Sequence, residues 1–310
     1  MISPHQPDRA ALQQLLGAVD SGLQLVRARP MTGGVSAAVT AIDARLPGGK
    51  MMKLVLRQYG QADVRAKPSV ASDEYRLLAA LQAAGLPVPR PYLADESCAV
   101  LPGPLLLIEF IDGVPGTGPR ATADLTGRLA AVLAQLHKAV LGPADTAYLP
   151  DIRVISADLL GTRPPTLDAA LSEAAIRAAL TGSWPPAQSN RQAVLHGDFW
   201  PGNTLWRHGR LVAVIDWEDA ATGDPLADLG NARLELAMTA GAGAMHEFTR
   251  QYRALMPDLD VAALPGWDLY AALRPAGKIA SWGLPAAKLA AMRAAHRQFV
   301  AGALARLQVG

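Results

Sequence analysis

The segment VLHGDFWPGNTLW (194–206) places two oxygen-bearing side chains, Asp198 and Asn203, on a short turn between two apolar runs. The Pro-Gly pair at its centre favours a tight turn, which would project both side chains from one rigid edge. A second apolar run, LVAVID, ends at Asp216, thirteen residues after Asn203. A carboxylate at the end of a buried strand needs a partner to offset its desolvation, and a divalent metal ion is an obvious candidate.

The spacing of these three residues matches the catalytic layout of protein kinases. There, the first Asp accepts the proton of the attacking hydroxyl, whereas the Asn and the second Asp hold magnesium on the nucleotide phosphates. Taken singly, each residue could serve an ordinary hydrogen-bonded turn, but the joint spacing favours chemistry. We therefore interpret Asp198 as a catalytic base and Asn203 and Asp216 as Mg²⁺ ligands, with ATP as the phosphoryl donor. Phosphoryl transfer needs an aligned nucleophile and neutralised phosphate charge, and this set would supply both.

Two motifs, HGDFWPGN (196–203) and VIDWEDAATGDPLADL (214–229), resemble the paired motifs of the aminoglycoside phosphotransferase and choline kinase family. That family has a protein-kinase-like fold but carries His-Gly-Asp where protein kinases have His-Arg-Asp. The resemblance implies an α+β fold of two lobes, a small antiparallel β-sheet lobe and a larger, mainly α-helical lobe. It also implies an ATP- and Mg-dependent kinase that phosphorylates a hydroxyl group of a small molecule.

Three further residues of these motifs are interpreted as scaffold. His196 is expected to hydrogen-bond backbone near the turn and not to carry a proton. Asp224 and Asp228 are expected to cap a helix and to fix the loop.

The pattern along the chain also predicts two lobes. Residues 22–111 mix apolar and β-branched runs with turn residues, including a Pro-Gly-Gly turn at 47–49 that is typical of a hairpin. From about residue 121, Ala, Leu and Arg recur at helical spacing. Strand-like runs return only at 193–217.

The boundary between the lobes is predicted close to residue 111. We assign 1–111 to a nucleotide-binding lobe and 112–310 to a catalytic and substrate-binding lobe, with a hinge at about 109–113. The segment IDGVPGTG (111–118) is predicted to be a linker, because Gly and Pro interrupt both helical and strand patterns.

A kinase-like fold requires a phosphate-covering loop in the first lobe. The segment MTGGVSAAVTAI offers Gly33, Gly34 and Ser36, and consecutive glycines let backbone N–H groups approach phosphate oxygens. The alternative is an ordinary hairpin turn. The family commonly has Asn where Ala37 stands here, so that contact is lost or rearranged.

The fold also requires a cation on a strand and a carboxylate on the next helix. Arg57 stands where protein kinases have Lys, and as a planar fork it can also neutralise phosphate. Lys53 would share its strand face and is the alternative. Glu74, in a predicted helix at 71–85, is the matching carboxylate, although an acid near a helix N-terminus is also favoured by the macrodipole.

The apolar run LLLIEFIDG (105–113) resembles the hinge of the same family. The resemblance implies that adenine would hydrogen-bond to backbone at Glu109 and Ile111.

The composition of the chain disfavours several classes of binding partner and of site. Half of the 310 residues are apolar, which is typical of a packed globular protein. With 29 basic and 27 acidic residues, no nucleic-acid or membrane partner is expected. The single cysteine, Cys98, excludes an internal disulfide and a multi-Cys zinc site, and with no signal-peptide pattern it favours a cytoplasmic location. No Walker-type phosphate loop or complete dinucleotide fingerprint occurs.

The acceptor is expected not to be strongly cationic. From 261 to 310 the chain has one acidic residue, Asp268, against six basic ones, which would complement a polycation poorly. Two alternatives stay open: a non-catalytic, nucleotide-binding pseudokinase, and an aminoglycoside or macrolide antibiotic-resistance kinase. A protein kinase is disfavoured because the segment after Asp216 is too short for an activation loop and lacks Ala-Pro-Glu.

Overall fold

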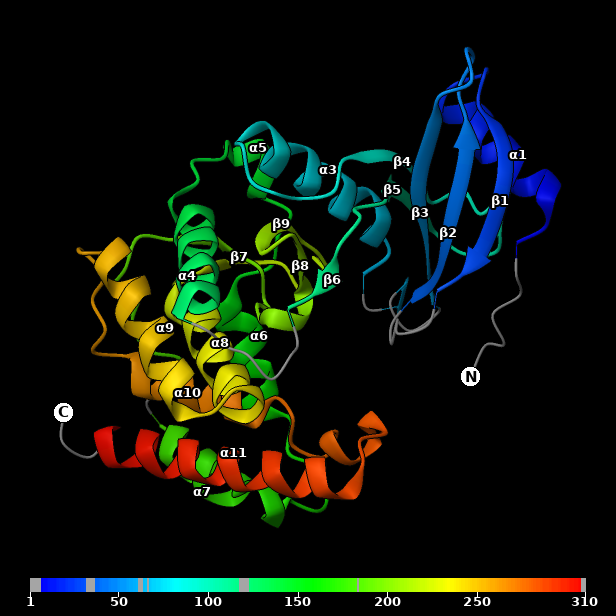
Figure 1. The fold of residues 1–310 in the computed structure, drawn as a ribbon. Coiled ribbons are helices and arrows are strands. Elements are labelled where there is room, and N and C mark those ends of the chain that lie inside the picture. Colours follow the sequence, from blue (N-terminus) through cyan, green and yellow to red (C-terminus); the bar gives the residue numbers. More distant parts are fainter. Residues whose placement is uncertain are drawn as a thin grey trace. The chain divides into compact units, whose positions relative to one another are not determined.

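A computed structural model of the protein describes residues 7–31, 37–60, 64–65, 67–116, 123–182 and 184–307. The chain divides into two compact units (Figure 1). Unit 1 comprises Met1–Gly113, Leu141–Tyr148 and Val212–Glu218. Unit 2 comprises Val114–Val140, Leu149–Leu211 and Asp219–Gly310. Two short segments from beyond residue 111 therefore pack with unit 1, and one of them contains Asp216.

An antiparallel sheet in the order β1-β2-β3-β5-β4 forms the centre of unit 1, as expected for the small β lobe. Its strands are β1 (Gln24–Pro30), β2 (Ala37–Arg45), β3 (Met51–Tyr59), β4 (Pro91–Asp95) and β5 (Leu105–Glu109). The predicted hairpin joins β2 to β3, and the Leu46 N–H donates to the Lys50 carbonyl across the turn at 2.8 Å. Because β3 is the middle strand, Arg57 is flanked by Val39 of β2 and Leu106 of β5.

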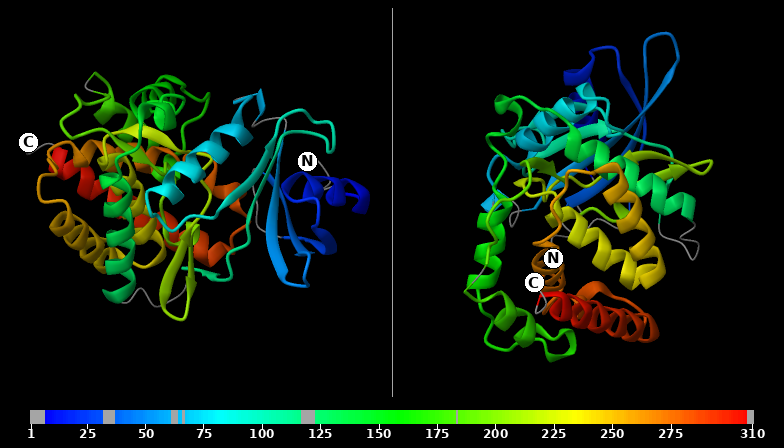
Figure 2. Two further views of the ribbon diagram at one scale, coloured as in Figure 1. Left: turned by 90° about the horizontal axis from the view of Figure 1, so that it is seen from above. Right: turned by 90° about the vertical axis from the view of Figure 1, so that its left-hand side faces the viewer.

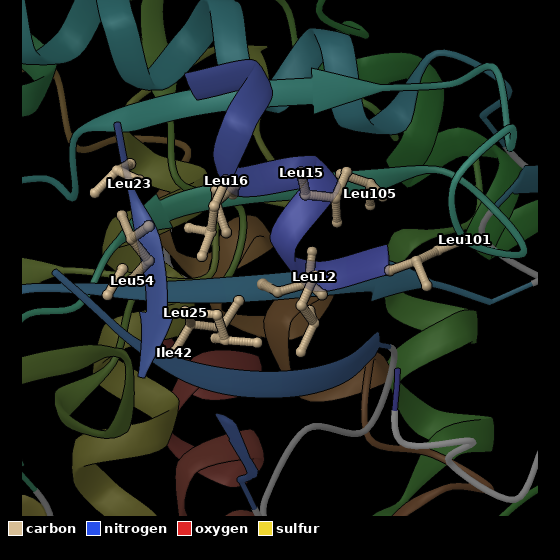
Figure 3. Close-up of a cluster of buried hydrophobic side chains, with 12 residues drawn as sticks. Leu12, Leu15, Leu16, Leu23, Leu25, Ile42, Leu54, Leu101 and Leu105 are labelled. Atoms are coloured by element: carbon tan, nitrogen blue, oxygen red, sulfur yellow. The ribbon is translucent and has the colours of Figure 1, made fainter. Parts of the chain in front are cut away.

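Helices cover both faces of this sheet. On one face, α1 (Arg9–Val19) contributes Leu12, Leu15 and Leu16 to an apolar core with Leu54 and Leu56 of β3 (Figure 3). Residues 54 and 56 point to that face, so Arg57 points to the other. There it meets Glu74 of α3 (Val70–Ala83), the predicted helix, which packs against β4 and β5. A four-residue helix, α5 (Pro143–Thr146), also belongs to this unit.

Unit 2 is mainly helical, as expected. Its helices are α4 (Ala123–Lys138), α6 (Ile152–Gly161), α7 (Glu173–Leu180), α8 (Leu226–Thr239), α9 (Ala242–Leu255), α10 (Leu264–Leu273) and α11 (Ala286–Leu307). Helix α8 packs against α9, α10 and α11, and α9 packs against α4. The views in Figure 2 show α11, in red, beside the orange α10, with which it also packs.

A buried ion-pair network joins three of these helices. Asp268 of α10 accepts hydrogen bonds from Arg233 of α8, at 2.9 and 3.0 Å, and from Arg306 of α11, at 3.0 Å. The one acidic residue counted in the C-terminal region therefore has a packing role.

Short strands complete unit 2. Strand β7 (Ala193–Leu195) pairs antiparallel with β10 (Ala221–Gly223). The boundary between the units falls inside the predicted linker, after Gly113, but its next residues, Val114 and Pro115, form β6, which pairs with β8 (Thr204–Arg207). Strand β9 (Arg210–Val214) follows β8, and its last three residues belong to unit 1. In the described part of the chain, no helix has the length and apolar character needed to cross a membrane.

Candidate active site

The turn between β7 and β8, residues 196–203, carries the predicted base. We call it the Asp198 turn. It ends in a 3₁₀ turn, Pro201–Asn203, as the Pro-Gly pair predicts. Gly197 has a φ of +81°, and a Cβ atom there would lie 1.9 Å from the Asp219 carbonyl oxygen. Only glycine fits this position, because any side chain would displace the neighbouring backbone.

Amide groups hold both oxygens of the Asp198 carboxylate. Asn203 donates its side-chain N–H to the Asp198 backbone carbonyl at 2.9 Å and to Oδ2 at 3.1 Å. Asn231 of α8 donates to Oδ1 at 3.4 Å and to the Phe199 carbonyl at 3.3 Å. The Asp198 side chain nevertheless remains 37% exposed. The carboxylate is thus oriented and accessible, as a general base requires.

Asp228 of α8 holds the start of the turn. Its carboxylate accepts the backbone N–H of His196 at 2.7 Å and that of Gly197 at 2.9 Å, and it contacts His137 Nε2 at 3.2 Å. Burial raises the pKa of Asp228, but His137 and the His196 N–H outweigh burial and leave the pKa below its usual value. His196 itself is fully buried, and its Nδ1 accepts the Asp198 N–H at 3.2 Å. These contacts support scaffold roles for both residues.

Asp224, the other aspartate predicted to cap a helix or fix the loop, also accepts a backbone N–H. It accepts the Leu226 N–H at 3.0 Å at the start of α8.

In unit 1, Arg57 pairs with three carboxylates. Its guanidinium donates to Glu74 at 2.5 Å and to both Asp216 and Glu218 at 3.0 Å. The side chains of Arg57 and Glu74 are 10% and 3% exposed. Burial lowers the pKa of Arg57, but the nearby acids, Glu74 foremost, raise it above its usual value. The structure thus brings together the predicted cation and its helix carboxylate.

Tyr59 completes this cluster, and no sequence motif indicated a role for it. Its hydroxyl donates to the second oxygen of Glu74 at 2.7 Å. Burial, followed by the charge of Glu74, raises the pKa of Tyr59 above its usual value, so the hydroxyl stays a donor. Lys53, the alternative cation, is exposed and lies over the Phe110 ring at 5.6 Å.

Asp216 differs from its expected environment. It follows β9 with a φ of +70°, and its side chain is 43% exposed. The preceding strand joins unit 1 through a hydrogen bond from the Val214 N–H to the Pro87 carbonyl at 2.7 Å. The carboxylate is therefore neither deeply buried nor dependent on a metal ion for a partner, because Arg57 is its counter-charge.

The two predicted metal ligands lie in different units, Asn203 in unit 2 and Asp216 in unit 1. Across the residues that the structure describes, no group of three or more His, Cys, Asp or Glu could hold a metal ion alone. Asn203 uses its amide N–H on Asp198, so its amide oxygen is the atom that could bind a metal ion. The amide oxygen of Asn203 and, separately, the carboxylate of Asp216 are each of the oxygen type that Mg²⁺ binds beside water and phosphate.

The predicted nucleotide contacts are described only in part. Gly33, Gly34 and Ser36 lie outside the described residues. At the predicted hinge, the Glu109 N–H donates to the Arg90 carbonyl at 2.8 Å and the Phe110 N–H donates to the Lys53 carbonyl at 3.1 Å. The Glu109 N–H is therefore already used within unit 1.

Three polar residues near Asp198 were missed from the sequence: Asn231, Glu235 and Arg274. Burial, with the Asp198 charge second, raises the pKa of Glu235 to about 7, although Arg274 opposes the shift. The spacing of Asn231 and Glu235, one helical turn apart after the second motif, places them on one face of α8 and could have indicated both. No local pattern indicates Arg274.

Comparison with known proteins identifies relatives of the whole fold. A model of the phosphotransferase enzyme family matches residues 27–306. Acyl-CoA dehydrogenase family member 10 of Mus musculus is 23% identical over 256 residues, which are 71% of this chain and 23% of that protein. The chain thus spans about a quarter of the length of this relative.

Solved structures give the same fold. Macrolide 2'-phosphotransferase MphH from Brachybacterium faecium is 26% identical, with a TM-score of 0.56 and coverage of 93% of this chain and 97% of that chain. Amicoumacin kinase hAmiN, solved with AMP-PNP, Ca²⁺ and Ami, is 14% identical, with a TM-score of 0.62 and coverage of 95% and 94%. These matches confirm the predicted kinase-like fold, and the chain belongs to the phosphotransferase enzyme family.

Proposed function

We propose that this phosphotransferase transfers the γ-phosphoryl group of ATP to a hydroxyl group of a small molecule, with Asp198 accepting the proton of that hydroxyl. The observation that carries the proposal is that the two carboxylate oxygens of Asp198 accept hydrogen bonds from Asn203 and Asn231 while the side chain stays accessible. A base held in one orientation needs little reorganisation when the hydroxyl arrives.

The other predicted site residues have roles that fit their contacts. Asn203 and Asp216 would hold Mg²⁺, which when bound neutralises phosphate charge. Arg57, kept charged by its carboxylates, would face the phosphates with Glu74 fixing its direction. Gly33, Gly34 and Ser36 would cover the phosphates with backbone N–H groups.

Adenine recognition would use backbone. Because the Glu109 N–H is bonded to Arg90, Glu109 would offer its carbonyl and Ile111 its N–H. Hydrogen bonds of this kind would discriminate adenine without any side-chain contribution. The amicoumacin kinase of the same fold, solved with AMP-PNP, supports ATP as the donor.

For the acceptor we propose a neutral or weakly charged hydroxyl compound. Two of the basic residues counted in the C-terminal region, Arg274 and Arg306, pair with Asp219 and Asp268. These two arginines are thus neutralised within the protein, and Glu235, whose pKa burial raises to about 7, carries only part of a negative charge at neutral pH, so neither sign of charge on the acceptor is strongly favoured. The likeness to a macrolide 2'-phosphotransferase makes macrolides the first hydroxyl compounds to screen. The exposed Cys98 fits the proposed cytoplasmic location.

Purified protein with ATP and Mg²⁺ would be screened against hydroxyl compounds by ADP release, with ³¹P NMR of the product. Asp198→Asn should reduce kcat by about 10²- to 10⁴-fold, the range for loss of a general base. Asp158→Asn, which changes an exposed carboxylate on α6, is the matched control and should retain wild-type kcat. Unchanged turnover in Asp198→Asn would refute the assignment of the base.

A further inference from the structure

Arg274, the residue that follows α10, reaches the Asp198 turn with both of its terminal nitrogens. Nη1 donates to the Gly197 carbonyl at 2.7 Å and to Oδ1 of Asn231 at 2.6 Å. Nη2 donates to Asp219 at 3.2 Å. Nη1 also lies 3.7 Å from Oδ1 of Asp198 itself. One side chain from a distant helix therefore contacts the turn, its support and its carboxylate.

The contact with Gly197 fixes the peptide that leads into Asp198. The carbonyl of that peptide accepts from Arg274, and its N–H, which belongs to Asp198, donates to His196 Nδ1 at 3.2 Å. Bonds on both sides of a peptide plane leave it little freedom to rotate. The direction in which the Asp198 side chain leaves the backbone follows from that plane.

The contact with Asn231 fixes an amide that touches Asp198. Asn231 accepts from Arg274 with its oxygen, so its nitrogen must face the other way. That nitrogen donates to Oδ1 of Asp198 and to the Phe199 carbonyl. If Arg274 were absent, the Asn231 amide could rotate and present an oxygen to the Asp198 carboxylate, which would repel it.

The charge of Arg274 is surrounded by acids. Asp198, Asp219 and Glu235 all interact with it, as does Tyr270, which precedes it by one helical turn on α10. Burial lowers the pKa of Arg274, but Asp198 and these neighbours raise it above its usual value, so the guanidinium stays charged. Its side chain is 25% exposed, which leaves these contacts only partly screened by water.

We propose, resting on the function proposed above, that Arg274 is a positioning residue for phosphoryl transfer, which orients Asp198 through the Gly197 peptide and the Asn231 amide. Its positive charge also offsets the carboxylates of Asp198, Asp219 and Glu235. It does not touch the acceptor or the nucleotide in this role.

Two substitutions separate the hydrogen bonds from the charge. Arg274→Lys keeps the charge but cannot reproduce these three bonds, because its single ammonium nitrogen replaces the two nitrogens of the planar fork. Arg274→Gln removes the charge as well. Arg306→Gln is the matched control, since it also removes a partly exposed arginine from a carboxylate, Asp268, in unit 2.

Kinetics test the positioning. Arg274→Gln should lower kcat by about 100-fold, the size of effect expected for a misplaced catalytic group, with the KM for ATP within about threefold of wild type. The kcat of Arg274→Lys should fall between those of wild type and Arg274→Gln. Arg306→Gln should keep wild-type kcat even if its melting temperature drops as far as that of Arg274→Gln. Wild-type kcat in Arg274→Lys and Arg274→Gln would overturn the proposal, as would an equal loss in Arg306→Gln.

A second measurement needs no turnover. In an NMR titration of the Glu235 carboxyl carbon, wild type should titrate near pH 7. Arg274→Gln should titrate higher, because Arg274 lowers this pKa, and Arg274→Lys should stay close to wild type. A merely loosened fold would expose Glu235 and move its pKa down towards the ordinary value, which would contradict the proposal. If Arg274→Gln does not fold, Arg274→Lys still tests the proposal by its kcat.

These outcomes are separable from failure of the proposed function. Wild-type protein that phosphorylates no hydroxyl compound would refute that function. The titration of Glu235 would still report whether Arg274 organises the charges around Asp198.

Discussion

Asn203 and Asp198 are joined twice, because one side-chain amide donates both to the backbone carbonyl and to Oδ2 of Asp198, at 2.9 and 3.1 Å. Asn203 is thus linked to Asp198 through its nitrogen, and its oxygen is the atom that we propose as a metal ligand. Asn231 holds the other oxygen of Asp198 but has its own oxygen bonded to Arg274. The two amides contact the same carboxylate and should differ in function.

Asn203→Ala and Asn231→Ala are predicted to separate metal binding from base orientation. Asn203→Ala should raise the Mg²⁺ concentration for half-maximal rate by about 10- to 100-fold, the usual cost of losing a group in or near a metal's ligand shell. Asn231→Ala should lower kcat by about 10-fold or more through misorientation of Asp198, with the Mg²⁺ dependence unchanged. Rate measurements over a Mg²⁺ series check both, and the same Mg²⁺ shift in the two variants would refute the division of roles.

Gly197→Ala is predicted to abolish activity, whereas Gly209→Ala should not. Both glycines have positive φ, +81° and +71°, so both alanines carry a backbone cost of about 1–2 kcal/mol. At Gly197 the new Cβ would also meet the Asp219 carbonyl at 1.9 Å, while at Gly209 no atom of the described residues lies within 4 Å. Stability by denaturant titration and kcat should show the difference; an active Gly197→Ala would contradict the rigid turn.

Arg57→Met is predicted to destabilise unit 1. Removal of one partner from a buried ion pair leaves the other uncompensated, which typically costs about 3–5 kcal/mol. Of the hydrogen-bond partners that the described residues give Glu74, the Tyr59 hydroxyl would remain. Urea unfolding should show the loss, and the KM for ATP should rise because a phosphate-facing charge is gone.

Glu218→Gln is the control for Arg57→Met. Glu218 is 25% exposed, so removal of its charge should cost much less stability. Equal destabilisation by the two substitutions would contradict the central role of the Arg57–Glu74 pair.

The pH dependence of the free energy of unfolding should show the raised pKa of Glu235. Its pKa is raised by burial and by Asp198 to about 7 in the folded protein, above the ordinary 4.5. Between these values the folded state binds more protons than the unfolded state, so stability falls as pH rises, by up to about 1.4 kcal/mol per pH unit. Glu235→Gln should remove this contribution and gain stability over wild type from pH 4.5 to 7, with no gain below. A free energy of unfolding with the same pH slope in both proteins would refute it.

Some of the fold was predictable because it is local. The Pro-Gly pair of the Asp198 turn and the Pro-Gly-Gly hairpin between β2 and β3 act through the backbone preferences of the residues that form them. The helix with Glu74 was also predicted. In contrast, the 111–118 segment was predicted to be a linker, although Val114 pairs with Trp206 in another part of the chain. The turn-forming residues of a segment do not indicate a partner strand elsewhere in the chain.

The count of charges in the C-terminal region does not show which of them are paired. It gave equal weight to Arg274, Arg306 and Asp268, each of which is paired within unit 2. Composition records which charges exist and not which of them cancel.

The sequence by itself determined the family, the Asp198 turn and the spacing of Asp198, Asn203 and Asp216, because motif spacing and turn geometry are properties of short segments. Tertiary structure decided what holds them. Arg57 meets Asp216 across 159 positions of the chain, and Arg274 meets the Gly197 carbonyl across 77. Such contacts arise from the packing of whole helices and strands, so no local pattern links Arg57 to Asp216 or Arg274 to the Asp198 turn.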